Sequence, residues 1–408
     1  MKPIYIVSWL FALAVSFVSC DDWLDKTPKD RLYPDVYFKT EDELRLFTNQ
    51  FYNNLVPSAV DIYSESSDLI VKSDLMLEMS GQRIIPDEGN GWNFTALRDI
   101  NFYLQYSHNC TEVNARNRYD GVARFFRAYF YFEKVKRYGD IPWYDKALDS
   151  DDPELYKARD SREFVMQKML EDLDFAIANL PKTKNAYVLT RWTALALKSR
   201  VCLFEGTFRK YHGLEDCEKY LNACVSASET FMNESGYTLY KSGSTPYRDL
   251  FASINLQADE VIFGRDYEAS LSVLHNVQNY ENSTTMGRPG MNKKIVNSYL
   301  MADGSRFTDK AGYETMTFDQ ECQNRDPRLA QTIRTPGYTR IGSTKKEAPN
   351  LAYTMTGYHL IKYSMTANYD EYNKSCNDIP LFRTAEVYLN FAEAKAELGT
   401  LKQADINK

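Results

Sequence analysis

The stretch "GVARFFRAYFYFEKVKRYGDIPWYD" (residues 121–145) carries the clearest helical signal in the chain. Apolar side chains recur at the three- and four-residue spacing of one helical face, and basic side chains supply the other face. The apolar set is Val122, Phe126, Tyr129, Phe130 and Val135, and the basic set is Arg124, Arg127, Lys134 and Arg137. Gly139 and Pro142 follow, as a C-terminal glycine and a later proline do at a helix end. The pattern predicts a long amphipathic helix that ends near residue 139.

Further helical patterns follow this stretch. Residues 160–181 open with Asp160 and Glu163 at capping-box spacing and end at Pro181. Residues 190–206 place small side chains on one face, and residues 214–232 are helical after a short loop. Such helix pairs, with a period near 34 residues and Ala-plus-aromatic contacts, are typical of tetratricopeptide repeats, although none matches the full consensus.

The residue composition changes between about residues 235 and 380, and the helical periodicity fades. Gly, Ser, Thr, Asn and Pro become frequent there, and "ENSTTMGRPGMN" (281–292) is typical of a loop. Helical pattern returns in residues 379–399, and the chain ends at Lys408, a few residues into what looks like another helix. A helical repeat array needs a polar cap at its end, and none is visible. We therefore expect a truncated chain.

An apolar leader precedes all of this. About fifteen mainly apolar residues run from Ile4 to Val18, fewer than the roughly 20 that span a bilayer, so they indicate a signal peptide. Small Ser19 and then Cys20 follow, which indicates cleavage before a lipidated cysteine. The alternative is an ordinary secretory peptide with a cysteine there by chance, and Phe17, where a lipobox more often has Leu, favours that alternative.

The charge and the cysteine spacing of the chain argue against some classes of function. The 408 residues carry a formal net charge of −7 and no basic block stands out, which argues against binding to nucleic acid. Six cysteines remain besides Cys20, with no zinc-like spacing, and we expect most to be free buried thiols. Cys217 and Cys224 lie about 10 Å apart along a continuous helix, too far for a disulfide.

Four segments together resemble the SusD/RagB family, the nutrient-binding outer-membrane lipoproteins of Bacteroidetes. They are the arm "CDDWLDKTPKD" (20–30), the helix "ARFFRAYFYFEKVKRYGDIP" (123–142), "NRDPRL" (324–329) and "FRTAEVYLNFAEAKAELG" (382–399). The resemblance covers nearly the whole chain after the leader, in the order that the family has. Family members usually continue past this point, which supports the expected truncation.

The resemblance implies a mainly α fold, with a tetratricopeptide-like helical scaffold and an irregular, loop-rich ligand-binding region. It implies a protein that is lipid-anchored in the outer membrane, faces the cell surface and delivers its ligand to a SusC-like TonB-dependent barrel. The divisions that we expect are 1–19 as lipoprotein signal peptide, 20–40 as lipidated arm, 41–234 as helical repeats, 235–380 as loop-rich region and 381–408 as the start of C-terminal repeat helices.

We expect no enzyme, metal or cofactor. The four histidines (His108, His212, His275 and His359) stand at no metal-ligand spacing from one another. Paired carboxylates for a hydrolase stay open, because 56 acidic residues make chance pairs inevitable.

For glycan binding, the candidates are aromatics in loops with polar neighbours, because flat rings stack on sugars while amide and charged groups bond hydroxyls. Trp92 follows two glycines in "GNGWNF", and Tyr63 lies in the polar "DIYSESSD". The expected ligand-binding residues are Trp92, Asn93, Tyr63, Arg265, Tyr267, Asn279, Tyr280 and Arg288. Each aromatic has the alternative of an ordinary structural role.

Two ligand classes stay open at this point. The first is an oligosaccharide, and the second is a peptide, as in the RagB branch, since loop aromatics suit both. A tetratricopeptide adaptor that binds only protein is a weaker third alternative.

Overall fold

The computed structural model describes residues 36–63, 67–86, 89 and 91–408, so Cys20 and the leader lie outside the described residues. Helix α7 (Val113–Tyr138) confirms the predicted long helix, and Gly139 ends it with a φ of +70°. A positive φ costs glycine little, which suits it to this position. Phe126, Phe130 and Val135 on α7 belong to the largest hydrophobic core.

Arg127 corrects the simple picture of an exposed basic face on α7. Its side chain is buried and forms two hydrogen bonds to the Asp172 carboxylate, at 2.6 and 2.7 Å. The next helix covers that side of α7, so a cation there needs a buried carboxylate as its partner.

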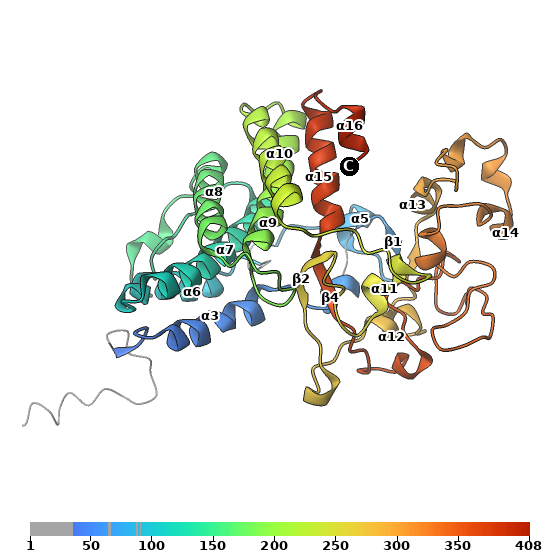
Figure 1. Cartoon of the computed structure of the whole chain (residues 1–408), viewed down its shortest axis with the longest axis horizontal. Helices are drawn as coiled ribbons and strands as arrows, with labels where there is room; N and C mark the ends of the chain where they lie inside the picture. The colour runs from blue at the N-terminus through green and yellow to red at the C-terminus, as the bar shows by residue number, and fades with distance from the viewer. Residues whose placement is uncertain (1–35, 64–66, 87–88, 90) are drawn as a thin grey trace, which may run out of the picture.

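Helices stack in sequence order on α7. Helix α7 packs on α8, α8 on α9, α9 on α10, and α10 on α15, while α3 and α6 lie along α7 (Figure 1). These helices are α3 (Glu41–Leu55), α6 (Thr95–Tyr106), α8 (Arg162–Asn179), α9 (Arg191–Tyr211), α10 (Cys217–Glu234) and α15 (Thr384–Glu397), followed by the short α16 (Gln403–Ile406). This arrangement confirms the predicted helical-repeat scaffold.

The start of α8 differs from the prediction in its cap. Ser161, rather than Asp160, is the N-cap, and its Oγ accepts a hydrogen bond from the Phe164 amide at 3.3 Å. The Asp160 carboxylate instead accepts a hydrogen bond from the Trp143 amide at 2.7 Å. It therefore ties the segment after α7 to the start of α8.

Helices α9 and α10 approach closely at Gly206. A Cβ built on Gly206 would lie 2.7 Å from Cγ of Leu221, nearer than side chains tolerate. The missing side chain lets Leu221 pack directly on the backbone of α9.

The rest of the described chain is rich in loops, with short elements among them (Figure 1). Its helices are α4 (Val60–Tyr63), α5 (Leu77–Ser80), α11 (Pro246–Ala252), α12 (Val277–Glu281), α13 (Lys293–Ser298) and α14 (Phe318–Glu321). Its strands are β1 (Ile70–Val71), β2 (Val261–Arg265), β3 (Gly290–Met291) and β4 (Ile379–Arg383).

Two antiparallel strand pairs connect distant segments. Strand β2 pairs with β4, which leads directly into α15 and so joins the loop-rich region to the helices. Strand β1 pairs with β3, so residues 70–71 lie against the segment that the sequence predicts to be a loop. That segment, 281–292, is therefore loop only between its ends, because α12 ends at Glu281 and β3 begins at Gly290.

The six cysteines in the described chain are free thiols, four of them buried. Cys217 and Cys224 lie on α10, as expected, without a bond between them. No helix in the described part of the chain is both long and apolar enough to cross a membrane.

Candidate functional site

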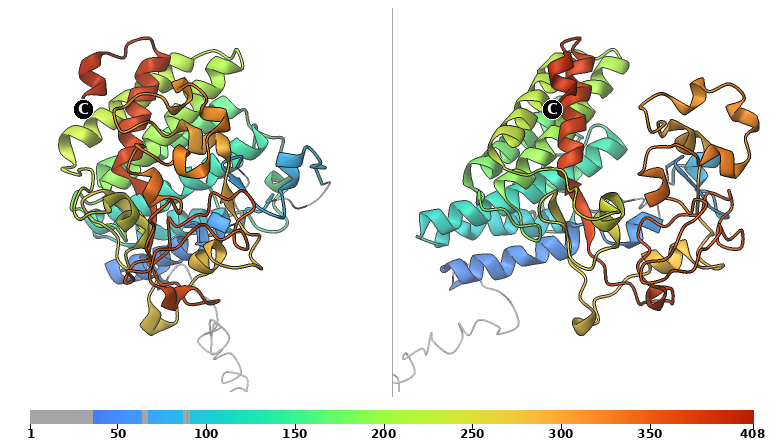
Figure 2. Two further views of the ribbon diagram at one scale, coloured as in Figure 1. Left: turned by 90° about the vertical axis from the view of Figure 1, so that its right-hand side faces the viewer. Right: turned by 45° about the vertical axis from the view of Figure 1, so that its right-hand side comes forward.

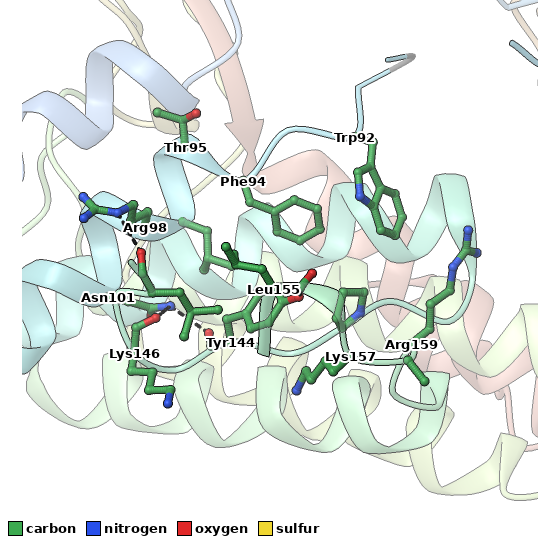
Figure 3. A pocket seen from close by; sticks show the side chains of 14 residues that line it. Trp92, Phe94, Thr95, Arg98, Asn101, Tyr144, Lys146, Leu155, Lys157 and Arg159 are labelled. Carbon is green, nitrogen blue, oxygen red and sulfur yellow. Dashed lines mark hydrogen bonds between the residues drawn. The ribbon is translucent and has the colours of Figure 1, made fainter. Parts of the chain in front are cut away.

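An open cleft of about 580 Å³ lies between the loop before α6, helix α6 itself and the segment that follows α7 (Figure 3). Its volume falls within the range of about 300–1,000 Å³ for small-molecule sites. The described residues that line it are Trp92, Phe94, Thr95, Leu97, Arg98, Asn101, Pro142, Tyr144, Lys146, Leu148, Leu155, Lys157, Ala158 and Arg159.

Trp92 is the exposed aromatic of this cleft. Its side chain is 40% exposed, although its ring makes edge contacts with Phe94 and Tyr138 at centroid distances of 5.3 and 4.9 Å. Lys134 of α7 donates a hydrogen bond to the Gly91 carbonyl, which holds the loop beside Trp92. The ring thus packs against two aromatic neighbours while part of it faces solvent.

Asn93 has a local role next to Trp92. Its Oδ1 accepts a hydrogen bond from the Thr95 amide at 2.8 Å, at the start of α6. An Asn side chain that bonds the backbone two residues on stabilises such a turn. Asn93 therefore positions the loop, and it is absent from the described lining of the cleft.

Tyr144 forms the opposite wall. Its amide donates to Oη of Tyr131 at 2.6 Å, and its own hydroxyl donates to the Glu154 and Leu155 carbonyls at 3.2 and 3.3 Å. Burial raises the pKa of Tyr144 above its ordinary value of 10.0, so the phenol stays neutral and serves as a donor. In Figure 3 Trp92 and Phe94 lie on one side of the cleft and Tyr144 and Leu155 on the other.

A buried polar network holds this wall in place. Nδ2 of Asn101 donates to the Tyr144 and Lys146 carbonyls at 2.8 and 3.3 Å, while its Oδ1 accepts from Arg127 at 3.2 Å. Arg127 in turn pairs with Asp172 on α8. The wall is therefore connected to two scaffold helices, as a rigid site requires.

Cationic side chains surround the aromatic surface. Lys146 pairs with Glu154 at 2.9 Å, and Lys157 pairs with Asp160 at 2.9 Å. Arg98 donates to the Leu148 carbonyl at 3.1 Å, and Arg159 lies with its guanidinium carbon 5.0 Å from the centroid of the Trp92 ring. These groups supply hydrogen-bond donors around a largely apolar lining.

Two of the predicted aromatics lie elsewhere and are buried. Tyr280 is 3% exposed on α12, so it is not in a loop as the sequence predicts. Tyr267 is 7% exposed, and its hydroxyl accepts a hydrogen bond from the Ala59 amide at 2.8 Å. Both have the burial of structural side chains.

The predicted polar residues donate mainly to backbone carbonyls. Arg265 donates to the carbonyl of Val56, Asn279 to that of Asp370, and Arg288 to those of Leu351 and Ala352. Tyr63 ends α4, and its side chain lies outside the described part of the chain.

Two of the predicted site residues line other cavities. Tyr280 lines a cavity of about 390 Å³ together with Tyr247, Tyr299 and Tyr363, and Arg265 lines a third one of about 510 Å³. The structure therefore separates the predicted site residues, and of those whose side chains it describes only Trp92 lines the first cleft.

Most residues of the Trp92 cleft lie outside the set that the sequence predicts. Phe94 and Thr95 stand beside Trp92 in the same loop, and Tyr144 belongs to "GDIPWYD", directly after the long helix. An aromatic pair after a helix-ending Gly and Pro was the available signal for this wall. Arg98 and Arg159 carry no such signal, because their place depends on how α6 meets the segment after α7.

No group of three or more His, Cys, Asp or Glu side chains in the described chain could hold a metal ion. His275 and His359 are buried, and each bonds a backbone carbonyl, of Asn377 and Glu281 respectively. Burial lowers their pKa values to about 4 and about 3, so both are neutral at pH 7.

Two family models match separate parts of the chain. A sequence model of the SusD family matches residues 250–408, and one described as "starch-binding associating with outer membrane" matches residues 81–191. SusD-like protein P2 of Formosa agariphila is 25% identical over 95% of this chain and 76% of its own length.

Solved structures share the fold. A SusD-like protein of Bacteroides fragilis aligns with a TM-score of 0.73 and 21% identity, over 94% of this chain and 80% of its own. A SusD-like carbohydrate binding protein of the same species gives 0.70 and 18%, over 91% and 77%. Two family matches, a relative along most of the chain and this common fold confirm the resemblance of the motifs to the SusD/RagB family.

Proposed function

We propose that this protein binds an oligosaccharide in the Trp92 cleft and does not cleave it. The observation that carries the proposal is a 40% exposed Trp ring at the mouth of a cleft with an aromatic wall and several hydrogen-bond donors. The family resemblance supports it, because one of the two matching family models describes starch binding.

The physical basis is stacking combined with hydrogen bonding. A sugar ring that covers about 75 Å² of the Trp92 face would gain on the order of 2 kcal/mol from apolar burial. Thr95, Arg98 and Lys157 line the same cleft and can donate to hydroxyl groups. Their position on α6 and on the segment tied to α7 and α8 keeps this arrangement fixed before the ligand arrives.

We further propose that the protein is anchored through Cys20 to the outer membrane and delivers its ligand to a SusC-like TonB-dependent barrel. The family model's description of association with the outer membrane supports the location. A binding protein by itself moves nothing across a membrane, so an uptake role requires a partner that accepts the ligand.

The test of the binding proposal is titration calorimetry against a panel of neutral and charged oligosaccharides with wild type and Trp92→Ala. We expect binding in wild type and a loss of at least about tenfold in Trp92→Ala, since about 2 kcal/mol of stacking is removed. Tyr372→Ala is the matched control, because Tyr372 is 71% exposed and lies outside the described lining of the cleft. Equal losses in both variants contradict a site at Trp92.

Two measurements test the proposed absence of cleavage and the proposed barrel partner. Chromatography of any bound oligosaccharide after long incubation should show it intact, and shorter products would overturn the non-catalytic role. Gentle solubilisation of membranes should recover a large barrel in near-equal amount. Capture of peptides, with no saccharide bound, would instead favour a RagB-like peptide carrier.

A further inference from the structure

The charge of the Trp92 cleft is opposite to the charge of the whole chain. The protein carries a formal net charge of −7. The described residues that line the cleft nevertheless include four cations and no acidic side chain. The cations are Arg98, Lys146, Lys157 and Arg159. A cleft that concentrates one sign of charge in this way attracts ligands of the opposite sign.

Three of these cations already have acidic neighbours outside the lining. Lys146 has Glu154 at 2.9 Å, and Lys157 has Asp160 at 2.9 Å. Arg98 lies 3.7 Å from the exposed Asp149, a distance at which an ion pair in water contributes little. Lys146 and Lys157 are therefore largely compensated, and Arg98 only weakly.

Arg159 differs from the other three. Among the described residues it has no carboxylate in ion-pair range, and its one hydrogen bond goes to the Tyr138 carbonyl at 3.5 Å. Its side chain is exposed, and its guanidinium carbon lies 5.0 Å from the centroid of the Trp92 ring (Figure 3). Arg159 thus offers a cation with no carboxylate partner among the described residues, and this cation lies over the Trp92 ring, next to the part of the ring that is open to a sugar.

We propose that the Trp92 cleft selects an acidic oligosaccharide, with the sugar ring on Trp92 and its anionic group on the Arg159 guanidinium. This inference rests on the proposed glycan-binding function and specifies its ligand class. A planar guanidinium binds a carboxylate through two parallel N–H···O bonds, and it binds a sulfate ester through similar ones. A neutral hydroxyl at the same place accepts one hydrogen bond from the guanidinium but brings neither the second parallel bond nor the opposite charge.

The two anionic groups have different sources, a uronic acid or a sulfated sugar, and both fit the same fork. The Arg159 guanidinium lies only a few ångströms from the Trp92 ring. An anionic substituent on the sugar that stacks on Trp92, or on the neighbouring sugar, can therefore reach it. Direct competition between the two kinds of sugar decides the source.

The experiment compares matched ligands that differ only in charge. Tetragalacturonic acid and its methyl ester form the first pair, and a sulfated galactan tetrasaccharide and its desulfated form make the second. At low salt we expect the charged member of at least one pair to bind about tenfold more tightly than its neutral partner. Added salt should reduce this ratio, because it screens the exposed pair.

Two variants assign the effect to Arg159. In Arg159→Gln the charged-to-neutral affinity ratio should fall to within about twofold of one, because the charged member loses more affinity than the neutral member does. Arg306→Gln removes the same charge from an exposed side chain outside the described lining of the cleft, and it should leave the ratio unchanged. A ratio that survives Arg159→Gln overturns the assignment.

The outcomes separate this inference from the proposed function. Equal binding of charged and neutral members contradicts acidic selectivity but leaves glycan binding in place. Binding of none of the four sugars, nor of any neutral oligosaccharide in the wider panel, contradicts the proposed function itself. Tighter binding of tetraglutamate than of every sugar would overturn both in favour of an acidic peptide.

Discussion

Trp92 and Tyr280 look alike in the sequence, since each is an aromatic in a polar neighbourhood, but their environments in the structure are opposite. Trp92 is 40% exposed at a cleft, whereas Tyr280 is 3% exposed in a second cavity between α4, α12 and β4. The sequence leads us to expect that substitution of both leaves stability nearly unchanged. That expectation holds only for the exposed residue.

We therefore predict different effects of Ala at these two positions. Trp92→Ala should change the free energy of unfolding by less than about 1 kcal/mol, whereas Tyr280→Ala should lower it by about 3 kcal/mol, in the range of buried aromatics. Urea unfolding followed by circular dichroism measures both. A Tyr280→Ala protein as stable as wild type would show that this ring is not part of the core.

Glu281 follows Tyr280 and is a buried acid. Its carboxylate accepts hydrogen bonds from the Tyr363 amide and from Oγ of Ser364, at 3.1 and 2.7 Å. Burial raises its pKa from 4.5 to about 7, although these hydrogen bonds and the charges of Arg340 and Arg248 act in the lowering direction. The folded protein therefore binds this proton more tightly than the unfolded chain does.

The consequence is a stability that falls as pH rises through this window. Between about pH 4.5 and pH 7 the folded state holds the Glu281 proton that the unfolded chain releases, so ionisation costs up to about 3 kcal/mol by pH 8. Glu281→Gln cannot ionise. We expect the stability of this variant relative to wild type to increase between pH 5 and pH 8.

Unfolding of both proteins at each pH isolates the effect. His275 and His359, whose pKa values are lowered, act in the opposite direction, since stability from them is lost as pH falls below about 6.5. Their contribution cancels in the difference between the two proteins. A difference that does not vary with pH would contradict a raised pKa for Glu281.

At the scale of the elements, the contact of α9 with α10 depends on Gly206. A Cβ there would lie 2.7 Å from Cγ of Leu221, whereas a Cβ on Gly121 of α7 would lie at an ordinary 3.4 Å from the Leu180 side chain. Both glycines lie inside helices, so both substitutions gain the same helix propensity. They form a matched pair that differs in packing.

We predict that Gly206→Ala destabilises the protein and Gly121→Ala does not. Overpacking costs about 1–3 kcal/mol, which exceeds the propensity gain of up to about 1 kcal/mol, so Gly206→Ala should lose about 1–2 kcal/mol. Gly121→Ala should be neutral or slightly stabilising. Thermal unfolding of the two variants measures the difference, and Leu221→Ala should cost less stability in the Gly206→Ala background than in wild type, because the smaller side chain relieves the overpacking. Equal melting temperatures for the two single variants would contradict a close approach of α9 and α10.

At the scale of the whole molecule, stacked helices form one side and the loop-rich region the other, as Figure 1 and the right-hand view of Figure 2 show. Strand β4 leads from the loop-rich region directly into α15 of the stacked helices. Strand β2 pairs with β4 at this junction. Burial of Phe263 and Phe382 in the main core makes this connection part of the scaffold. The two sides are therefore joined by packed strands.

The anchor proposed at Cys20 acts at this scale. Several acyl chains on one cysteine, with each buried CH₂ contributing about 0.8 kcal/mol, hold a protein stably at a membrane. Cys20→Ala should therefore move the protein from the membrane fraction to the soluble fraction. Fractionation with mass spectrometry of the N-terminal peptide checks this, and continued membrane association without lipid mass would contradict the anchor.

The amino-acid pattern by itself determined the helical scaffold. Residues 121–145 predict α7 and its end at Gly139 because helical periodicity and a glycine stop are local properties, written in consecutive residues. The same holds for α9 and α10, and for α15 from Thr384 onward, whereas residues 379–383, predicted as helical, form strand β4 and pair with β2. The longer motifs also indicated the family resemblance, because they extend over several turns of helix and into the loops.

Only the tertiary structure decided which polar and aromatic side chains are accessible. Arg127 looks like a surface cation until α8 brings Asp172 to it, and Tyr280 looks like a loop aromatic until α4 and β4 cover it. Arg159 gains its place beside Trp92 although 67 positions of chain separate them. Periodicity reports which face of an element is apolar, but burial and the meeting of distant side chains depend on which elements pack together. That information lies in no local stretch of the sequence.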